Sequence, residues 1–357
     1  MEQFQVGIHG IGVALPAHIR KNAEWPPSFA EEIRGKTRSD LTLVDVSKET
    51  ALLVKEVLGK YSTDPFRGSV ERRVIASEED GSDLETRAAV QALAVAEANP
   101  SDIDLLIVSS AVPDLLGSGN ASAVHRKLGL PKTCLTLNHD NQCSSAVSSI
   151  ITAQVMLASG AYRKALIVQS AVFSRVLPYE LPLSVNFGDG ATAAVLGPVS
   201  GHRGLLGSSW FNDGSYHRAV CTAPRGGGRW QDAKGGLVTA SLEPEKGREA
   251  IFRFGDMAKE AVDAAAEKAN IDLKDVKFFA CHQPTAWFVE LCQRSAMLQH
   301  AAAPSTFSQT AGLGPCNVML NLNEGLMTGA LRRDDLVAVY SMGSGFTWGA
   351  AILRWGR

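Results

Sequence analysis

Hydrophobic and polar positions follow two alternating patterns along the chain. Leu84–Ala98 carries small and apolar residues at helical spacing, and after a short acidic turn it leads to the apolar run 104–110. Met257–Ala269 has the same spacing and leads through a second acidic turn to the apolar run Val276–Cys281. Alternating helices and buried strands predict an α/β fold. Their recurrence half a chain apart indicates an internal duplication.

Two segments interrupt this alternation. Residues 223–236 contain too many glycines for a regular element, so we expect a surface loop that borders a substrate entrance or is an inert connection. Residues 22–67 are charged and mostly helical in pattern, which suggests a cap or insertion over the core. The arginine–glycine tract of the first segment is single and short, so it does not by itself indicate RNA binding.

Composition and charge narrow the class of protein. The 357 residues are enough for two domains or one large duplicated domain, and the formal net charge of −2 offers no field for nucleic acid or an anionic membrane. No apolar run approaches the roughly 20 residues of a spanning helix, and the first residues resemble a strand rather than a signal peptide. The six cysteines form no CxxC pair and no zinc-type cluster. We therefore expect a reduced, cytoplasmic enzyme without a metal site.

Cys143 stands where a short strand gives way to a helix without charge. The strand-like run Cys134–Asn138 ends in polar residues, and no charged residue occurs between Asp140 and Arg163. Such a helix is normally buried, and the N–H groups and dipole at its N-terminus stabilise a thiolate and a tetrahedral oxyanion. A thiolate there accepts and releases acyl groups. The alternative is that Cys143 is a small buried hydrophobic residue.

His282 ends the strand Val276–Cys281 of the second repeat, and Pro284 suits the first turn of a following helix. If the two repeats pack about a pseudo-twofold axis, the strand ends that carry Cys143 and His282 converge. Imidazole is the natural acid or base for thiol chemistry near neutral pH. The sequence therefore predicts that Cys143 and His282 work as a pair.

The chain ends in two strand-like runs that flank Gly343-Ser344-Gly345. Glycines in such a place permit a tight turn and a close approach of the backbone to a ligand. A backbone N–H group of this turn would give the oxyanion a second donor, and a plain hairpin is the alternative.

The run Gly343–Trp355, GSGFTWGAAILRW, resembles the C-terminus of β-ketoacyl-acyl-carrier-protein synthase III. Further matches to that family cover nearly the whole chain in order. They are Arg67–Arg73, Asp104–Asp114, the segment around Cys143, Asn186–Leu196 and His282-Gln283.

The resemblance implies a thiolase fold, in which two similar βαβαβαββ halves form a five-layer α-β-α-β-α sandwich. Residues 1–200 would form the half with the nucleophile and residues 201–357 the half with the histidine. It also implies Cys143 as nucleophile, His282 as catalytic histidine, and the N–H groups of Cys143 and Gly345 as the oxyanion hole.

The same resemblance implies the substrates and partners. The family uses no bound cofactor or metal, takes its acyl group from a coenzyme A or acyl-carrier-protein thioester, and attacks the acyl-cysteine with a carbanion from malonyl-carrier protein, releasing carbon dioxide. It implies a homodimer, with a heterodimer as the alternative, and neither nucleic acid nor membrane as a partner.

The third catalytic residue of the family is missing from its expected place. Counting without a gap puts Gly312 where the family has an asparagine that, with the histidine, binds the malonyl thioester carbonyl. Asn317 lies more than one helical turn further along and is the candidate replacement. Because loss of one such donor costs on the order of 100-fold, malonyl decarboxylation is in question while acylation of Cys143 is not.

The coenzyme A contacts of the family also differ. A tryptophan that stacks on the adenine in the family corresponds to Thr63, four residues before Arg67, and the basic residue before the Phe-Gly-Asp-Gly segment is replaced by the apolar stretch Leu181–Val185. A carrier protein or another donor could replace free coenzyme A. We expect the loops around 115–119 and 179–182 to help form the walls of the substrate pocket.

Three functions remain open from the sequence. The first is an acyltransferase (EC 2.3.1.-) that condenses the acyl group of Cys143 with a malonyl- or β-keto-type substrate in specialised fatty-acid or polyketide-like metabolism. The second is transfer of that acyl group to an oxygen or nitrogen nucleophile without decarboxylation. The third is a non-catalytic partner subunit, which the presence of both Cys143 and His282 disfavours.

Overall fold

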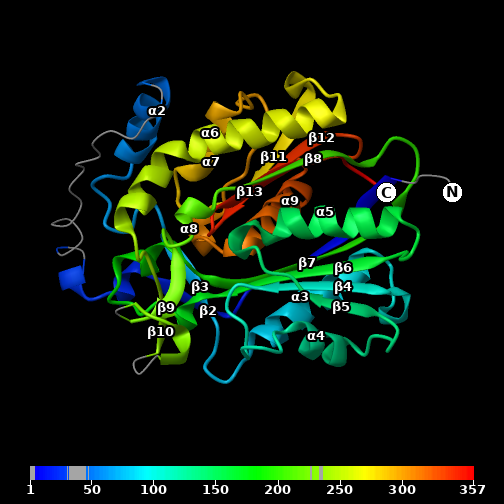
Figure 1. The fold of residues 1–357 in the computed structure, drawn as a ribbon, viewed down its shortest axis with the longest axis horizontal. Helices are drawn as coiled ribbons and strands as arrows, with labels where there is room; N and C mark the ends of the chain where they lie inside the picture. Colours follow the sequence, from blue (N-terminus) through cyan, green and yellow to red (C-terminus); the bar gives the residue numbers. More distant parts are fainter. Residues whose placement is uncertain (1–4, 30, 32–45, 47, 226, 233–235) are drawn as a thin grey trace.

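The computed structural model describes residues 5–357 apart from residues 30, 32–45, 47, 226 and 233–235. Its two main sheets lie one above the other, with helices α5 and α9 between them (Figure 1). Helices α3 and α4 cover the outer face of one sheet, and α6 and α7 cover the outer face of the other. This five-layer arrangement confirms the predicted thiolase fold.

The first sheet is five-stranded, with the order β1-β7-β6-β4-β5. Along the chain its elements follow the order βαβαβαββ. They are β1 (Gln5–Ala14), α3 (Gly81–Val95), β4 (Leu105–Ser110), α4 (Ala121–Leu128), β5 (Leu135–Asn138), α5 (Ser145–Ala158), β6 (Ala165–Val172) and β7 (Asp189–Val199).

The second sheet repeats that order with four strands, β8-β13-β12-β11. In place of a fifth strand, a single parallel bridge joins Phe278 of β11 to Ala302. The elements are β8 (Gly204–Asn212), α6 (Pro244–Ala269), β11 (Val276–Cys281), α7 (Phe288–Ser295), α9 (Asn317–Thr328), β12 (Leu336–Gly343) and β13 (Thr347–Arg354). The internal duplication expected from the sequence is therefore present, with one strand of the second copy reduced to a bridge.

Smaller elements cover one end of the sandwich. They are β2 (His18–Lys21) paired with β3 (Glu71–Val74), β9 (Cys221–Pro224) paired with β10 (Leu237–Ala240), and helices α2 (Lys48–Gly59) and α8 (Phe307–Thr310). The glycine-rich stretch 223–236 is thus the connection between two short paired strands, and part of it lies outside the described residues, as does much of the stretch 22–67.

Boundaries of three predicted helices were wrong. Helix α3 begins and ends three residues earlier than expected, and α6 begins at Pro244 rather than Met257, with its proline in the first turn. Gly247 and Gly255 had masked this early part because glycine is unfavourable inside helices. The helix after His282 begins only at Phe288, because residues 282–287 form an irregular turn with a Phe288 N–H to Thr285 C=O bond of 3.3 Å.

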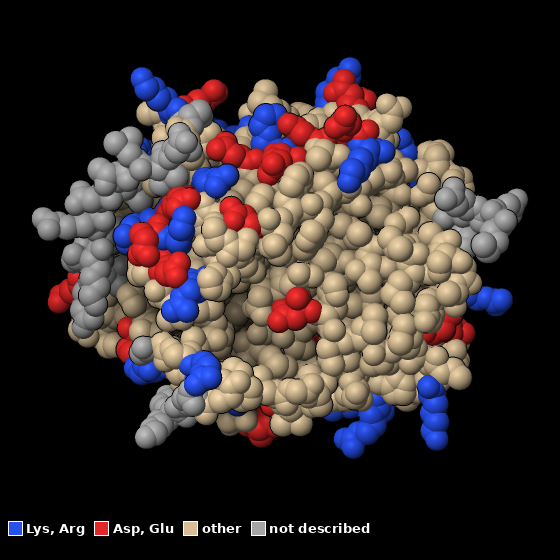
Figure 2. Space-filling view, in the orientation of Figure 1, with Lys and Arg blue, Asp and Glu red and all other residues tan. Residues whose placement is uncertain are grey.

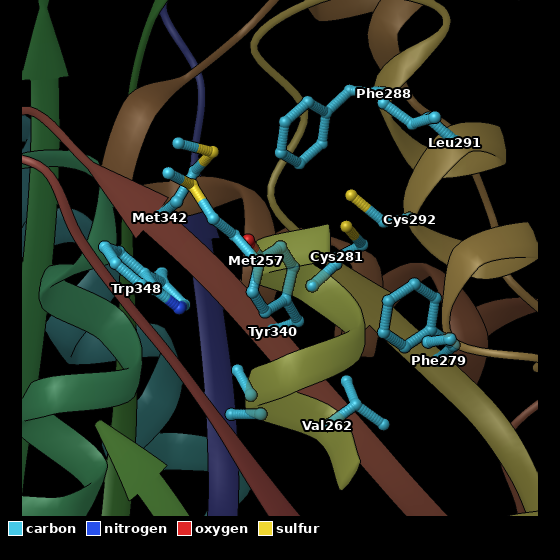
Figure 3. Close-up of a cluster of buried hydrophobic side chains, with 14 of the residues drawn as sticks. Met257, Val262, Phe279, Cys281, Phe288, Leu291, Cys292, Tyr340, Met342 and Trp348 are labelled. Carbon is cyan, nitrogen blue, oxygen red and sulfur yellow. The ribbon is translucent and has the colours of Figure 1, made fainter. Parts of the chain in front are cut away.

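Buried apolar side chains fill the space between each sheet and its helices. In the second half, side chains of α6 and α7 pack on those of β11, β12 and β13, and Cys281 and Cys292 point toward each other (Figure 3). Every residue of β6 and of β12 is buried, so the central strands are fixed from both sides. Among the described residues, no helix combines the length and apolar character needed to cross a membrane.

Candidate active site

Cys143 lies in a tight turn between β5 and α5. Residues Gln142–Ser144 form a short 3-10 helix, which Gln142 enters with a positive φ of 49°. The hydroxyl of Ser144 donates to the Asn141 carbonyl at 2.7 Å, and the Asn141 N–H donates to the Ser145 hydroxyl at 3.0 Å. These bonds hold the turn so that Cys143 stands at the start of the buried helix, as predicted.

The C-terminal hairpin of β12 and β13, which belongs to the second half, packs directly against the Gln142–Ser144 turn. A Cβ atom at Gly343 would stand 2.5 Å from the Asn141 carbonyl oxygen and 2.8 Å from the Ser144 nitrogen, so only glycine fits there. The Ser144 and Thr347 hydroxyls are 2.7 Å apart. The glycine turn that contains Gly345 is therefore attached to the two sides of Cys143.

His282 follows the last residue of β11 and is 2% exposed. Its N–H donates to the Tyr340 carbonyl of β12 at 2.9 Å, and its ring lies edge-on to Phe288. Since β12 also ends against the Cys143 turn at Gly343, one strand positions both predicted residues.

Gly314 provides a second link between them. A Cβ atom at Gly314 would lie 3.6 Å from the Cys143 sulfur and 2.9 Å from the Phe173 ring, and the Gly314 backbone interacts with the His282 imidazole. The structure thus brings both Cys143 and His282 close to Gly314.

The two residues do not occupy equivalent places in the repeats, contrary to the simple picture from the sequence. Cys143 follows the third strand of its half, whereas His282 follows the second strand of its half. The true counterpart of the Cys143 turn is the 3-10 turn Gly314–Cys316, which contacts it and leads into α9 at Asn317.

Enclosure by its neighbours changes the ionisation expected for Cys143, although the residue is partly exposed. This enclosure raises the pKa of the Cys143 thiol to about 12, and the negative charge of Asp140 adds to the rise. The helix N-terminus therefore does not make Cys143 a resting thiolate, because desolvation outweighs the backbone interaction that lowers the pKa. Cys143 needs a base when it reacts.

His282 is suited to be that base. Burial lowers the pKa of its imidazole to about 4, and interactions with the Gly314 backbone and the Asn317 side chain, which raise the pKa, offset only part of this. The Nδ1 atom is buried without a hydrogen-bond partner. At neutral pH the ring is uncharged and able to accept a proton.

Asn317, the candidate replacement for the asparagine of the family, lies beside His282. It is the first residue of α9, is 0% exposed and interacts with His282. Its Oδ1 accepts from the Leu313 N–H at 3.2 Å, which leaves its buried Nδ2 donor without a partner. The signal in the sequence was its place at the start of a helix that repeats the helix of Cys143.

Gly312, where the family has its asparagine, has no room for a side chain. A Cβ atom there would be 2.8 Å from the Gln283 carbonyl oxygen and 3.0 Å from that of Asn186. Its own N–H donates to the Asn186 carbonyl at 2.8 Å, and its carbonyl accepts from Gly188 at 3.1 Å. The absence of asparagine at position 312 is thus built into the backbone packing.

The segments that correspond to the coenzyme A contacts of the family lie around Thr63 and residues 181–185. Thr63 is exposed in a turn, while Trp25 is buried and its ring packs edge-on against Phe66 and Tyr179. The apolar stretch that begins at Leu181 forms the short 3-10 helix Pro182–Asn186, and its Val185 is buried in a cluster with Trp25. The loop at Leu115 and Leu116 is exposed at 66% and 59%. The sequence did not indicate that Trp25 packs near Phe66, because the two residues are far apart along the chain.

Three family models match the chain. Residues 137–214 match the model of 3-oxoacyl-[acyl-carrier-protein] synthase III, residues 266–355 match its C-terminal domain, and residues 67–174 match the N-terminal domain of thiolase. The matched segments include both Cys143 and His282.

Curated relatives align over the full length. The β-ketoacyl-[acyl-carrier-protein] synthase III of Symbiobacterium thermophilum is 28% identical over 99% of this chain and 98% of its own. The corresponding protein of Brucella suis is 26% identical over 98% of both chains.

Solved structures agree on the fold. The synthase III of Thermus thermophilus has a TM-score of 0.76 at 25% identity and covers 98% of this chain and 99% of its own. A Cys→Ser variant of Xanthomonas campestris OleA with bound lauric acid and lauroyl-CoA has a TM-score of 0.76 at 20% identity, covering 99% and 100%. The family models, the full-length relatives and the fold together support a divergent condensing enzyme of the thiolase superfamily that is similar to β-ketoacyl-acyl-carrier-protein synthase III.

Proposed function

We propose that this protein loads an acyl group from a coenzyme A or carrier-protein thioester onto Cys143 and joins it to a second, malonyl- or β-keto-type substrate. The observation that carries the proposal is the pair of uncharged groups, a Cys143 thiol and a His282 imidazole, that both lie next to Gly314. Residues 1–200 supply the nucleophile and residues 201–357 the base.

Acylation needs proton transfer during the attack. The Cys143 sulfur bonds to the thioester carbonyl carbon while its proton passes to His282, because a thiol of pKa about 12 is scarcely ionised at neutral pH. Collapse of the tetrahedral intermediate breaks the bond to the donor sulfur, and the proton on His282 leaves with that thiol. No net charge is left in the buried site.

The oxyanion of that intermediate would bind to the N–H groups of Cys143 and Gly345. Gly345 has a φ of 142°, which is strongly unfavourable for residues with a side chain, and its turn is tied to the Cys143 turn through Thr347 and Ser144. Two backbone donors fixed before the reaction stabilise the developing charge without reorganisation.

The second step would use Asn317. Its free Nδ2 donor beside His282 could bind the carbonyl of the second thioester and stabilise the enolate formed on loss of carbon dioxide. The enolate carbon then attacks the acyl-cysteine, the Cys143 sulfur leaves as a thiolate, and a proton taken up from solvent through His282 restores the thiol. This role restores the donor that Gly312 cannot carry.

The acyl donor and the assembly follow from the relatives and the surface. OleA binds lauroyl-CoA, which makes a medium- or long-chain acyl-CoA the first donor to test, together with carrier-protein thioesters. The surface over α5 carries almost no charge (Figure 2), Val155 of α5 is 61% exposed, and β5 is an edge strand. An uncharged helix beside an open strand edge suits a homodimer.

The test is product mass from purified enzyme with an acyl-CoA donor and malonyl-CoA or malonyl-carrier protein. A β-keto product and one carbon dioxide per turnover support condensation. An alkali-labile ester or an amide formed with an alcohol or amine, and no carbon–carbon product, would replace it with simple acyl transfer. No product and no acyl-enzyme would favour a partner subunit.

A further inference from the structure

Gly345 makes few contacts of its own. Among the described residues, and apart from its chain neighbours, a Cβ atom placed on Gly345 would have only atoms of Thr347 within 4 Å, the nearest at 3.5 Å. Glycine also has the widest choice of backbone conformations, and the φ of 142° is only one of those open to it. The direction of the Gly345 N–H group must therefore be fixed by the residues on either side of it.

On one side the turn is fixed by Gly343, which packs closely against Asn141 and Ser144. On the other side stands Phe346, which is 4% exposed. The Phe346 N–H donates to the Asp213 carbonyl, and the Asp213 N–H donates to the Phe346 carbonyl, both at 2.8 Å. This pair of bonds attaches the turn to the loop that follows β8.

Aromatic rings hold the side chain of Phe346 as well. The ring of Tyr216 is stacked on that of Phe346, with the centroids 5.4 Å apart and an interplanar angle of 11°. Tyr216 is the last residue of the 3-10 helix Gly214–Tyr216 and is 0% exposed. A second ring, Phe254 of α6, lies 6.1 Å from Phe346 at an angle of 46°. Close packing by two rings restricts the position of Phe346 and of the peptide that joins it to Gly345.

Charged side chains of α6 fix the Tyr216 ring in turn. Its hydroxyl donates to Glu249 Oε1 at 2.6 Å and accepts from Arg253 Nη1 at 3.1 Å. Lys246 donates to Glu249 Oε2 at 2.8 Å, and its Nζ lies 5.3 Å from the centroid of the Tyr216 ring. Hydrogen bonds with charged partners are shorter and stronger than those between neutral groups. The Tyr216 ring is therefore held at its hydroxyl as well as on its face.

We propose that Tyr216 is a positioning residue of the reaction, which fixes the Gly345 N–H group as an oxyanion donor through its stack on Phe346. The inference rests on the proposed function, because the oxyanion forms only when a thioester acylates Cys143. A backbone donor is effective when it points at the oxyanion before the charge develops, and a small displacement weakens it. Tyr216 thus acts through Phe346 and takes no part in bond making.

Two reactions of Cys143, compared in matched variants of the full-length protein, separate positioning from a general loss of structure. Tyr216→Leu removes the stacked ring, and Tyr216→Phe keeps it. Phe211→Leu is the matched control, because Phe211 of β8 stacks on Trp348 of the same C-terminal hairpin, with the centroids 5.8 Å apart at 12°. The two reactions are acylation by an acyl-CoA and methylthiolation by methyl methanethiosulfonate, in which the Cys143 sulfur bonds to the reagent sulfur and methanesulfinate leaves.

Only acylation forms an oxyanion, so only acylation should respond to the loss of the stack. We expect acylation to be about 10-fold slower in Tyr216→Leu and to stay within about 3-fold of wild type in Tyr216→Phe and Phe211→Leu. Methylthiolation involves no carbonyl, so its rate should be the same in all four proteins. Mass spectrometry of the peptide that contains Cys143 measures both rates.

Hydrogen exchange follows the turn without any reaction. The amides of residues 343–347 should exchange faster in Tyr216→Leu than in wild type and Phe211→Leu. Equal exchange, an unchanged acylation rate, or equal slowing of acylation and methylthiolation in Tyr216→Leu would each overturn the proposal. If Tyr216→Leu does not fold, Phe346→Leu removes the other ring of the stack and replaces it, with the same expectations. A wild type that is never acylated counts against the proposed function, and hydrogen exchange then decides the positioning alone.

Discussion

The starts of α5 and α9 occupy equivalent places in the two repeats, yet they carry different chemistry. Each central helix is preceded by a 3-10 turn, Gln142–Ser144 in the first half and Gly314–Cys316 in the second, and the two turns meet. The first presents the Cys143 thiol. The second presents a bare glycine and then the amide of Asn317.

The difference shows how a duplicated fold produces an asymmetric site. Gly314 leaves space beside the Cys143 sulfur, and Asn317 faces His282, which arrives from β11 of the same half. Hydrogen bonds of Asn141, Ser144 and Ser145 hold the first turn, which presents Cys143. Around the second turn, three buried atoms have no hydrogen-bond partner among the described residues, namely His282 Nδ1, Asn317 Nδ2 and Asn321 Oδ1. Unsatisfied buried groups of this kind are expected where a ligand completes the bonding.

Removing the base should have the largest effect. With His282→Asn, the Cys143 thiol loses its proton acceptor, and we expect acylation to slow by about 10²- to 10⁴-fold. The rate is measured by intact mass after mixing with an acyl-CoA. Raising the pH should partly rescue the variant, since the thiolate then forms without a base. A variant with wild-type acylation rates at pH 7 would contradict the assigned role.

The uncharged imidazole should also make the fold sensitive to acid. The pKa of His282 is about 4 in the folded chain and about 6.5 when unfolded. The unfolded state therefore binds more protons between these values, and stability from this group is present above pH 6.5 and lost as pH falls toward 4. We expect wild type to lose about 3 kcal/mol more unfolding free energy from pH 7 to pH 4 than His282→Asn does.

Chemical denaturation at pH values from 7 to 4 measures this difference. Comparison with His282→Asn cancels the contribution of His9 and His139, whose pKa values burial also lowers. Parallel pH dependence in the two proteins would show that the folded state tolerates a charged His282.

Asn317 should separate the two steps. Asn317→Ala removes the Nδ2 donor, so we expect condensation to slow by roughly 100-fold while acylation of Cys143 changes little. Asn321→Ala, one turn further along α9 and equally buried, is the control for loss of stability, because its amide bonds to the Cys281 carbonyl instead. Equal slowing of both steps by Asn317→Ala would indicate a purely structural residue.

Restoring the family asparagine should give the smallest effect. Gly312→Asn places a Cβ atom against the Gln283 and Asn186 carbonyls, and we expect a loss of about 1–3 kcal/mol in stability with no gain in condensation rate. Melting temperature and steady-state kinetics check this. A faster condensation rate would mean that the site accepts the family geometry after all.

Much of the fold could be predicted from the sequence because it rests on local pattern. The run Val276–Cys281 is a strand with the predicted ends, and the polar break before Cys143 correctly marked the start of a buried helix. The repeated helix and strand predicted two similar halves. These features depend on hydrophobic periodicity, which one chain segment carries by itself.

The rest depends on packing between distant segments. The pKa of Cys143 is raised by enclosure from both halves, which a sequence does not display. The lack of room at Gly312 arises from carbonyls of residues 186 and 283. Arg20 of β2 and Arg72 of β3 pair across a segment of about fifty residues, and both guanidiniums lie over the ring of Trp25, which counting back from Arg67 could not find.

Formation of an acyl-enzyme on Cys143 tests the central proposal most directly. Purified wild type and Cys143→Ala would be incubated with acyl-CoA and acyl-carrier-protein thioesters and weighed intact by mass spectrometry. We expect wild type to gain the mass of the acyl group from at least one donor and Cys143→Ala to gain none. Folded wild type without an adduct from any donor, or an equal adduct on Cys143→Ala, would contradict the proposed role of Cys143.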